Sequence, residues 1–302
     1  MTGNVIATRP VTGPLVSAFG TALVKADICY IDPVPQTVFI TGASTGIGRA
    51  AVVFFRDKGW NVAATMRTPS DHPDLVSDRV RTLPLDVTDA ATVRPALEQA
   101  IKAFGQVDVL VNNAGYGAFG PFEAATNEQI ERQYATNVTG LMYVTREFVP
   151  HFRERKSGVI INISSVGGRA TFPFYSLYHG TKWAVEGFSE SLNFELNPFG
   201  IRVKLVEPGV IQTDFTTRSL DVLKKDGLDV YDDVIKKFRE AWSAARNASP
   251  PELVAEVIYG AATDGTDQLR YIAGEDAKMI LDARGKASQE EYYAMIRKRL
   301  GL

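Results

Sequence analysis

The chain has 302 residues, of which 45% are hydrophobic and 23% charged, as in a globular protein with a large core. Its formal net charge of −2 gives no electrostatic reason to expect nucleic acid or an anionic membrane as a partner. The three histidines, His72, His151 and His179, are far apart in the sequence, so we predict no metal site.

Residues 1–35 differ in character from the rest of the chain. They mix Gly, Pro, Thr and short apolar runs, and Leu15–Val24 is too interrupted for a secretory signal. We expect a loosely ordered extension. The single cysteine, Cys29, excludes internal disulfides and favours a reducing compartment, which predicts a cytoplasmic protein. No apolar stretch reaches the ~20 residues that a membrane span needs.

From Gln36 onward, short β-branched runs alternate with longer helical patterns. The predicted strands are Thr37–Thr41, Asn61–Met66, Val80–Leu85, Val107–Val111, Val159–Ser164, Ile201–Val206 and Leu269–Ala273. The predicted helices include Ile47–Lys58, Asp89–Phe104, Asn127–Glu154 and Tyr178–Leu196. Several strands are apolar on successive residues, which is typical of strands covered on both faces. The alternation predicts an α/β fold with a doubly wound, Rossmann-like parallel sheet of about seven strands.

We expect one domain over residues 36–275, followed by a helical tail over 276–302. Within the domain, Thr213–Ala248 is polar, mixed in charge and without a strand pattern. Its apolar residues are spaced so that helical turns could turn one side toward a pocket. They are Phe215, Leu220, Leu223, Val230, Val234, Phe238 and Trp242. We expect a helical insertion, 213–248, that covers the substrate; the alternative is a permanently docked helical pair.

The first predicted strand ends in a glycine-rich turn, Thr41-Gly42-Ala43-Ser44-Thr45-Gly46-Ile47-Gly48, and a helix follows directly. Glycines allow a sharp turn and a close approach of backbone to ligand. The helix N-terminus offers free N–H groups and a positive dipole end to a pyrophosphate. The spacing is G-x-x-x-G-x-G, not the general G-x-G-x-x-G fingerprint. The turn predicts a dinucleotide site at Gly42, Ser44, Thr45, Gly46, Ile47 and Gly48; the alternative is a glycine-rich loop without a ligand.

The residue that would select between the two nicotinamide dinucleotides follows the second strand. An acid about 20 positions beyond the glycines would bind the adenosine ribose of NAD. This region reads Thr65-Met66-Arg67-Thr68 and contains no acid. A cation there suits the 2′-phosphate of NADP, so Arg67 favours NADP(H). The alternative is that Arg67 is a solvated loop residue.

Tyr178 and Lys182 are four residues apart at the start of a predicted helix, so their side chains share one face. A phenol has an ordinary pKa near ~10, and a neighbouring ammonium would lower it by stabilising the phenolate. The pair could therefore transfer a proton to or from a developing alkoxide.

Together these features resemble the short-chain dehydrogenase/reductase family between Thr37 and Asp214. The segments that carry the resemblance are Thr41–Gly48, Asn112-Asn113-Ala114-Gly115, Asn137, Ser164-Ser165, Tyr178 with Lys182, and Pro208-Gly209. The resemblance implies a Rossmann-fold oxidoreductase that transfers a hydride between NAD(P) and a carbonyl or alcohol carbon. It also implies a homodimer or homotetramer and a small-molecule substrate.

The resemblance assigns roles by position. It implies a catalytic tetrad of Asn137, Ser165, Tyr178 and Lys182, in which Ser165 binds the substrate oxygen and Asn137 holds a water that links to Lys182. Lys182 would also bind the nicotinamide ribose. The remaining cofactor contacts would come from Asp86, Val87, Asn113, Ala114, Gly115, Pro208, Gly209, Ile211 and Thr213. Asn112 is expected to join strands, and Ser164 to point away from the substrate.

Three alternatives remain beside this interpretation. Ser165 and His179 could form a hydrolase dyad, but no G-x-S-x-G turn surrounds the serine, and we expect His179 to be exposed. The aromatic residues Tyr116, Phe119, Phe122, Phe172 and Phe174 could line an apolar substrate pocket or belong to the core. A catalytically inactive dinucleotide-binding regulator could use the same fold.

Overall fold

The structure is a computed structural model that describes residues 35–213, 219–243 and 248–301. The predicted N-terminal extension therefore lies outside the described residues, apart from Pro35. Within the expected insertion, residues 214–218, which include Phe215, and residues 244–247 also lie outside the described ranges.

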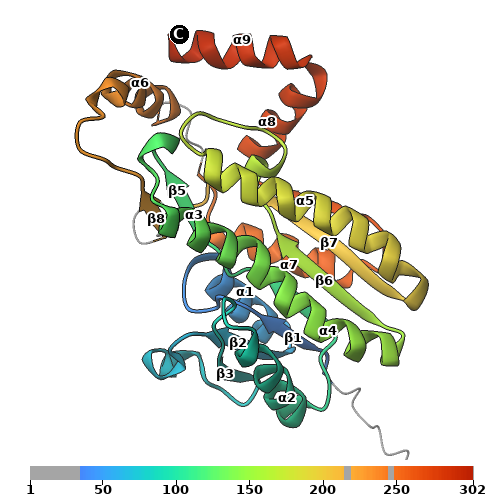
Figure 1. Ribbon diagram of the computed structural model, residues 1–302. Helices are drawn as coiled ribbons and strands as arrows, with labels where there is room; N and C mark the ends of the chain where they lie inside the picture. The colour runs from blue at the N-terminus through green and yellow to red at the C-terminus, as the bar shows by residue number, and fades with distance from the viewer. Residues whose placement is uncertain (1–34, 214–218, 244–247, 302) are drawn as a thin grey trace, which may run out of the picture. The chain divides into compact units, whose positions relative to one another are not determined.

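A seven-stranded parallel sheet forms the centre of the fold (Figure 1). Its order is β3-β2-β1-β4-β6-β7-β9, and every pairing is parallel, as the alternation of strands and helices predicted. The strands are β1 (Thr37–Ile40), β2 (Asn61–Met66), β3 (Val80–Pro84), β4 (Val109–Asn112), β6 (Gly158–Ile163), β7 (Ile201–Pro208) and β9 (Arg270–Ala273). The order reverses between β1 and β4, which is where such sheets bind ligands.

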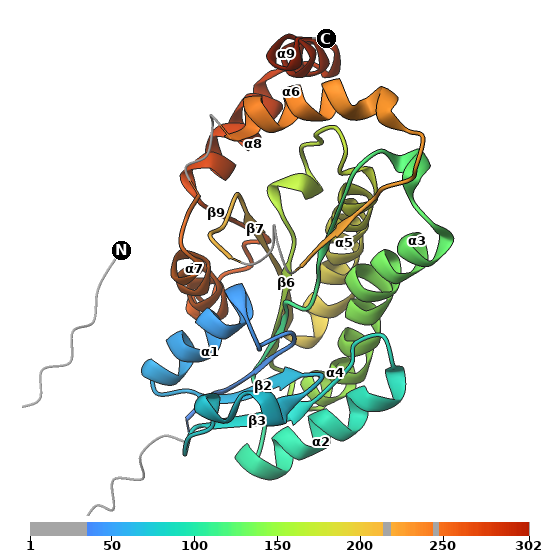
Figure 2. The ribbon, with the colours of Figure 1, turned by 90° about the vertical axis from the view of Figure 1, so that its left-hand side faces the viewer.

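Helices cover both faces of the sheet (Figure 2). On one face lie α1 (Gly46–Asp57) and α7 (Pro251–Thr263), which contact each other. On the other face lie α2 (Val93–Phe104), α4 (Leu141–Arg155) and α5 (Ser176–Leu196). Each face has its own apolar core: Phe55 and Ile258 belong to the first, and Phe39 and Phe148 meet edge-on at 4.8 Å in the second. Burial on both faces explains why the strands are apolar on successive residues.

The unbroken helix predicted over Asn127–Glu154 is wrong. The structure has α3 (Asn127–Tyr134), a π-helical turn (Ala135–Gly140) and then α4. The wider turn brings Gly140 against the segment that follows β3, since a Cβ at Gly140 would lie 2.7 Å from the carbonyl oxygen of Val87. Such turns often occur at functional positions, and this one carries Asn137.

Beyond the carboxyl ends of the strands lie five elements that we call the cap (Figures 1 and 2). They are β5 (Gly117–Phe119), β8 (Leu220–Val222), α6 (Asp232–Ser243), α8 (Glu275–Lys286) and α9 (Gln289–Leu300). β5 and β8 pair in parallel as a separate small sheet. The prediction that Thr213–Ala248 lacks a strand is therefore wrong; three residues are too few to show a strand period.

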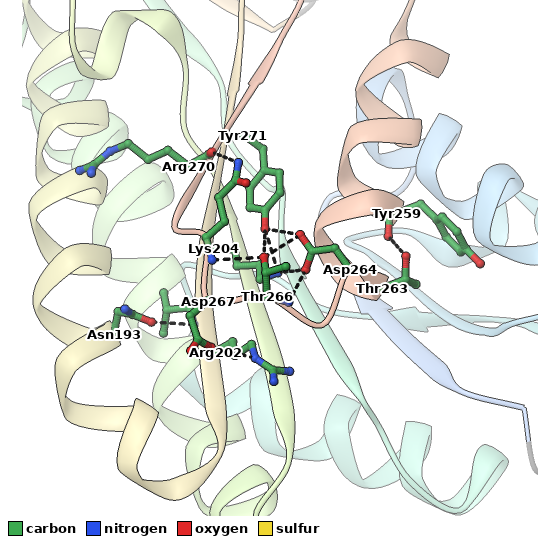
Figure 3. A network of polar contacts seen from close by, with 12 residues as sticks. Asn193, Arg202, Lys204, Tyr259, Thr263, Asp264, Thr266, Asp267, Arg270 and Tyr271 are labelled. Atoms are coloured by element: carbon green, nitrogen blue, oxygen red, sulfur yellow. Dashed lines mark hydrogen bonds and ion pairs between the residues drawn. The ribbon is translucent and has the colours of Figure 1, made fainter.

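A polar network around the buried Lys204 joins β7, the residue after α7 and β9 (Figure 3). Lys204 of β7 is 1% exposed, and its Nζ donates to Asp264 Oδ1 at 2.5 Å and to Tyr271 Oη at 2.9 Å. Tyr271 Oη in turn donates to Asp264 Oδ2 at 2.5 Å. The ammonium is thus paired and hydrogen-bonded, as a buried charge must be.

Among the residues that the structure describes, no helix is long and apolar enough to cross a membrane. In the same ranges, no three His, Cys, Asp or Glu side chains gather as metal ligands would.

Candidate active site

The glycine-rich turn joins β1 to α1 and leaves the N-terminus of α1 open. Thr45 occupies the N-cap position but makes no side-chain hydrogen bond to the helix, and the first turn has no acidic residue. The first N–H groups of α1 therefore have no capping side chain, and the local charge suits an anion. Gly46 has φ +53°, a conformation that favours glycine. These features fit the pyrophosphate of a dinucleotide.

Gly42 and Gly48 are needed for packing inside the protein. A Cβ at Gly48 would lie 2.3 Å from Gly42 O, and one at Gly42 would lie 2.8 Å from Ala114 Cα. Asn113 holds the turn by donating its Nδ2 to Thr41 O at 2.9 Å and to Gly42 O at 3.0 Å. The sequence analysis expected Asn113 to contact the cofactor and missed this structural role of its side chain. Any Asn that follows a neighbouring strand end is a signal for such a contact.

The segment after β7 reaches the same turn from the other side. A Cβ at Gly46 would lie 3.3 Å from Thr213 Cγ2, so these two predicted cofactor residues are adjacent. Gly209 packs instead against Asp276, whose Oδ2 accepts from Val210 N at 2.7 Å. This contact fixes the course of the chain from Pro208 to Thr213.

The predicted adenosine end lies at β2 and β3. Arg67 follows β2 and is exposed, and Asp86 follows β3. Asp86 Oδ1 accepts from Thr88 N at 2.9 Å and from Thr88 Oγ1 at 2.7 Å, so one carboxylate oxygen is already used. The sequence analysis missed that Arg49 of α1 forms an ion pair with Asp74.

The structure brings together Tyr178 and Lys182, which are four residues apart, and Ser165, which the family resemblance singled out. Lys182 is buried on α5, and its Nζ donates to Ile163 O at 2.7 Å, at the end of β6. The same nitrogen lies 5.8 Å from the centroid of the Tyr178 ring. Ser165 makes a side-chain hydrogen bond with Tyr178 and accepts from Gly167 N at 3.0 Å. The phenol, the hydroxyl and the ammonium therefore form one cluster.

The protonation of this cluster differs from the sequence-based expectation. Burial raises the pKa of Tyr178 to about 12, although the hydrogen bond with Ser165 acts in the opposite direction. Burial lowers the pKa of Lys182 to about 8, while the charge of Glu186 acts to raise it. The expected lowering of the Tyr178 pKa is wrong for the chain alone, because the cost of removing the phenolate from water outweighs the hydrogen bond with Ser165. The phenol keeps its proton at neutral pH.

Asn137 links the loop after β4 to α5. Its Nδ2 donates to Tyr116 O at 2.9 Å and to Thr181 Oγ1 at 3.1 Å, and its Oδ1 accepts from Tyr116 N at 3.1 Å. Thr181 Oγ1 itself donates to Tyr178 O at 2.7 Å. Asn137 therefore reaches the catalytic helix through Thr181, a residue that the sequence analysis did not single out.

The prediction that His179 is exposed is wrong. The loop before α5 folds over it, and its Nδ1 accepts from Phe172 N at 3.3 Å. Burial lowers the pKa of His179 to about 4, so the ring is neutral and holds the loop in place. Because Ser165 bonds to Tyr178 and His179 to Phe172, the geometry does not support a hydrolase dyad.

An aromatic wall extends from Tyr178 into the cap. The Tyr175 ring lies 6.2 Å from that of Tyr178 and 5.0 Å from Phe119, and Phe119 lies 5.9 Å from Phe238 of α6. Phe174 joins the wall with φ +67°, an unusual value for a residue with a side chain. Of the predicted aromatic set, Phe122 points to solvent and Tyr116 bonds to Arg132, so neither belongs to this wall.

The sequence pattern described as short chain dehydrogenase matches residues 36–222. The chain belongs to the short-chain dehydrogenase/reductase family. A curated oxidoreductase of Schizosaccharomyces pombe, itself uncharacterized, is 40% identical over 226 residues, which cover 72% of this chain and 92% of that relative. The 3-ketodihydrosphingosine reductase of Bacteroides thetaiotaomicron is 38% identical over 225 residues, covering 74% of this chain and 82% of the relative. Membership of this family makes the chain an NAD(P)-dependent oxidoreductase that acts on CH–OH groups.

Solved structures agree with this assignment. A short-chain dehydrogenase from Streptomyces avermitilis superposes with a TM-score of 0.77 at 32% identity, covering 88% of this chain and 98% of that one. A 3-ketoacyl-(acyl-carrier-protein) reductase from Brucella melitensis, complexed with NADH, gives 0.68 at 26% identity, covering 81% of this chain and 100% of that one. ElxO with NADP bound superposes with a TM-score of 0.65 at 27% identity, covering 79% of this chain and 97% of that one. Similar proteins thus bind either dinucleotide.

Proposed function

We propose that this chain is an NADP(H)-dependent enzyme that interconverts a carbonyl and a secondary alcohol on a small, apolar substrate, with Tyr178 as general acid and base. The observation that supports this most is the buried cluster of Tyr178, Ser165 and Lys182 at the end of β6. In this proposal residues 36–275 form the catalytic domain, with 213–248 as a substrate lid and 276–302 as a helical tail.

Each residue of the site has its own role in the proposed reaction. Ser165 hydrogen-bonds the substrate oxygen and orients it toward the Tyr178 hydroxyl. Tyr178 keeps its proton at neutral pH and donates it to that oxygen as negative charge develops there. Lys182 stabilises the resulting phenolate with its positive charge and binds the nicotinamide ribose. Asn137 positions α5 through Thr181 and holds the water that connects to Lys182. When bound, the dinucleotide supplies the hydride or accepts it.

The dinucleotide is proposed to lie along the carboxyl edge of the sheet, where the strand order reverses. The N-terminus of α1 would hold the pyrophosphate, since its N–H groups have no capping side chain. Arg67 would bind the 2′-phosphate of NADP at the end of β2. The proposed contacts are Gly42, Ser44, Thr45, Gly46, Ile47, Gly48, Arg67, Asp86, Val87, Asn113, Ala114, Gly115, Tyr178, Lys182, Pro208, Gly209, Ile211 and Thr213.

The aromatic wall supports an apolar substrate. Tyr175, Phe119 and Phe238 form a continuous series of rings beginning next to Tyr178. Phe119 and Phe238 are buried in an apolar cluster, so the partly exposed Tyr175 is the ring of this series that would meet an apolar substrate. A relative that is named for reduction of 3-ketodihydrosphingosine makes apolar ketones a sensible first class to assay.

The test is NADPH oxidation with aldehydes, ketones, quinones and steroid-like carbonyls, followed by two variants on the best substrate. Tyr178→Phe removes the proton donor, so turnover is expected to fall by about 10²–10⁴ while NADPH affinity stays nearly unchanged. Lys182→Ala is expected to damage both turnover and cofactor binding. Turnover of Tyr178→Phe within about tenfold of the parent would contradict the assignment of Tyr178 as the general acid and base.

The second candidate, an inactive regulator, predicts a different result in the same experiment. It requires tight dinucleotide binding with no turnover in either direction across the whole panel. The cluster of Ser165, Tyr178 and Lys182 argues against it, because sensing a dinucleotide needs no proton donor beside the nicotinamide.

The compartment is a separate proposal. Following the low cysteine content, we infer a cytoplasmic enzyme. Fractionation of cells that express the full chain tests this, and recovery in a membrane or organelle fraction would contradict it.

A further inference from the structure

The face of α5 that carries Tyr178 and Lys182 continues to a buried carboxylate. Glu186 lies four residues after Lys182, so the two side chains are neighbours on the helix surface. Glu186 is only 5% exposed. A buried carboxylate is costly unless it is paired, and neither substrate nor cofactor contacts require one at this depth.

Glu186 belongs to a charged cluster that spans four parts of the fold. Its Oε2 accepts from Arg270 Nε of β9 at 3.0 Å. The same Nε lies 3.5 Å from Glu207 Oε1 of β7, and Arg270 Nη2 donates to Glu190 Oε2 at 2.7 Å. Arg169, in the turn after β6, lies 3.2 Å from Glu207 Oε2. The charged groups facing this pair of buried carboxyls are therefore Lys182, Glu190, Arg169 and Arg270.

One oxygen of Glu186 is directed toward the catalytic end of β6. Its Oε1 is buried and has no hydrogen-bond partner among the described residues. A Cβ built at Gly168 would lie 3.1 Å from this oxygen and 2.6 Å from Ser164 Oγ, so both atoms border the same small glycine. Ser164 follows Ile163, whose carbonyl accepts the Lys182 ammonium. The unpaired oxygen and the ammonium thus approach the same end of one strand.

The negative charge of Glu186 acts to raise the pKa of both Lys182 and Glu207. Burial lowers the pKa of Lys182, and the negative charge of Glu186 opposes this. Burial also raises the pKa of Glu207 to about 7, and the Glu186 charge adds to this rise. As the pH falls through this value Glu207 loses its negative charge and competes less with Glu186 for Arg270.

We propose that Glu186, one helical turn from Lys182 and hydrogen-bonded by Arg270, is a positioning residue that holds Lys182 in its ammonium form. The inference rests on the proposed role of Lys182 and deepens it. Only the ammonium form can donate all of its hydrogen bonds and stabilise a phenolate. Burial disfavours the positive charge of Lys182, and a carboxylate one helical turn away stabilises that charge.

The experiment follows Lys182 directly in the chain without cofactor. Lysine labelled at Cε with carbon-13 is titrated by NMR in the parent and in Glu186→Gln, and Lys182→Arg assigns the signal. The Gln oxygen can still accept from Arg270, so the variant is expected to fold. The Lys182 midpoint is expected to fall by about one pH unit, a tenfold loss of ammonium at a given pH above it.

Glu190→Gln is the matched control. Glu190 also pairs with Arg270, but it lies two helical turns from Lys182 and is half exposed. Its replacement should leave the Lys182 midpoint within about 0.2 units of the parent, since exposed pairs act weakly. Glu186→Asp, which keeps the charge, should restore most of the midpoint lost in Glu186→Gln.

An unmoved Lys182 midpoint in Glu186→Gln, or an equal fall in Glu190→Gln, would overturn the proposal. If Glu186→Gln does not fold, the carbon-13 signal of the Glu186 carboxyl in the parent decides. It must report the ionised form at neutral pH, and the protonated form there would contradict the inference. Neither readout involves turnover, so a failed carbonyl screen with a shifted Lys182 midpoint would reject only the proposed reaction.

Discussion

Away from the active site, the buried Lys204 ammonium forms an ion pair with Asp264, whose side chain is 27% exposed (Figure 3). Asp264→Ala would leave the buried Lys204 ammonium without a carboxylate but with its hydrogen bond to Tyr271, which is expected to cost about 1–3 kcal/mol of unfolding free energy. Lys204→Met should cost less, because it removes the charge that needs a partner. Urea denaturation of both variants measures this. Asp267→Ala, which breaks an exposed pair with Arg202, is the control and should cost less than about 1 kcal/mol.

The stability that this ion pair contributes is expected to decrease at acid pH. Burial alone would raise the pKa of Asp264, but hydrogen bonds from Lys204 and Tyr271 outweigh it and lower the pKa from 3.8 to about 2. A lowered pKa contributes stability that is fully present above the unfolded value and is lost as the pH falls through the folded value. The difference between parent and Asp264→Ala should therefore shrink between pH 4 and pH 2. A constant difference over that range would contradict the pairing.

Replacing Arg67 tests the proposed preference for NADP(H) over NAD(H). If it binds the 2′-phosphate, the contact is worth on the order of 1–3 kcal/mol, or roughly 5- to 150-fold in affinity. Arg67→Ala should weaken NADPH by that factor and leave NADH nearly unchanged in fluorescence titrations. Arg79→Ala is a suitable control, because this exposed arginine precedes β3 at the opposite edge of the sheet. A parent that prefers NADH would reject the proposal.

At the level of elements, α6 is the part of the cap proposed to move. Phe238 anchors α6 against Phe119 and Phe174, while much of the rest of α6 is exposed. A segment with so few core contacts is expected to open at low cost. Hydrogen exchange over Thr213–Ala248 should therefore slow when NADP(H) and substrate bind, while α2 stays unchanged. Equal, strong protection in every state would show a fixed scaffold.

The large sheet was predictable because its strands are buried on both faces, and β6 shows this as three successive apolar residues, Val159–Ile161. The glycine turn and the spacing of Tyr178 and Lys182 were equally visible, since both are local in sequence. The π-helical turn at Ala135–Gly140 was not, because it packs Gly140 against Val87, a contact between segments far apart in the sequence. The exposure of His179 was predicted wrongly, and Glu186 was not singled out. The reason is the same, because the segments that bury both residues come from elsewhere in the chain.

At the scale of the whole molecule, the family resemblance leads us to propose a homodimer or homotetramer. Self-association would bury surface that one chain leaves exposed, and exposed Trp183 and Phe194 of α5 are candidates for that surface. Sedimentation velocity over a wide concentration range, with and without NADP(H), measures the state. A monomer under all conditions would contradict the proposal, whereas the active-site proposals would stand.

The small β5–β8 sheet has a consequence for the order in which the chain can assemble. Its two strands pair across roughly one hundred residues, so closing that loop in a free chain costs about 4 kcal/mol of entropy or more. Gly117 N–H and Leu223 N–H donate across the pair at 2.9 Å each, and hydrogen bonds of this kind return only about 1 kcal/mol apiece. The pair therefore gains stability only after the large sheet has brought β4 and β7 near each other and shortened the effective loop. The apolar wall beside Tyr178 is the last part of the site to become geometrically complete.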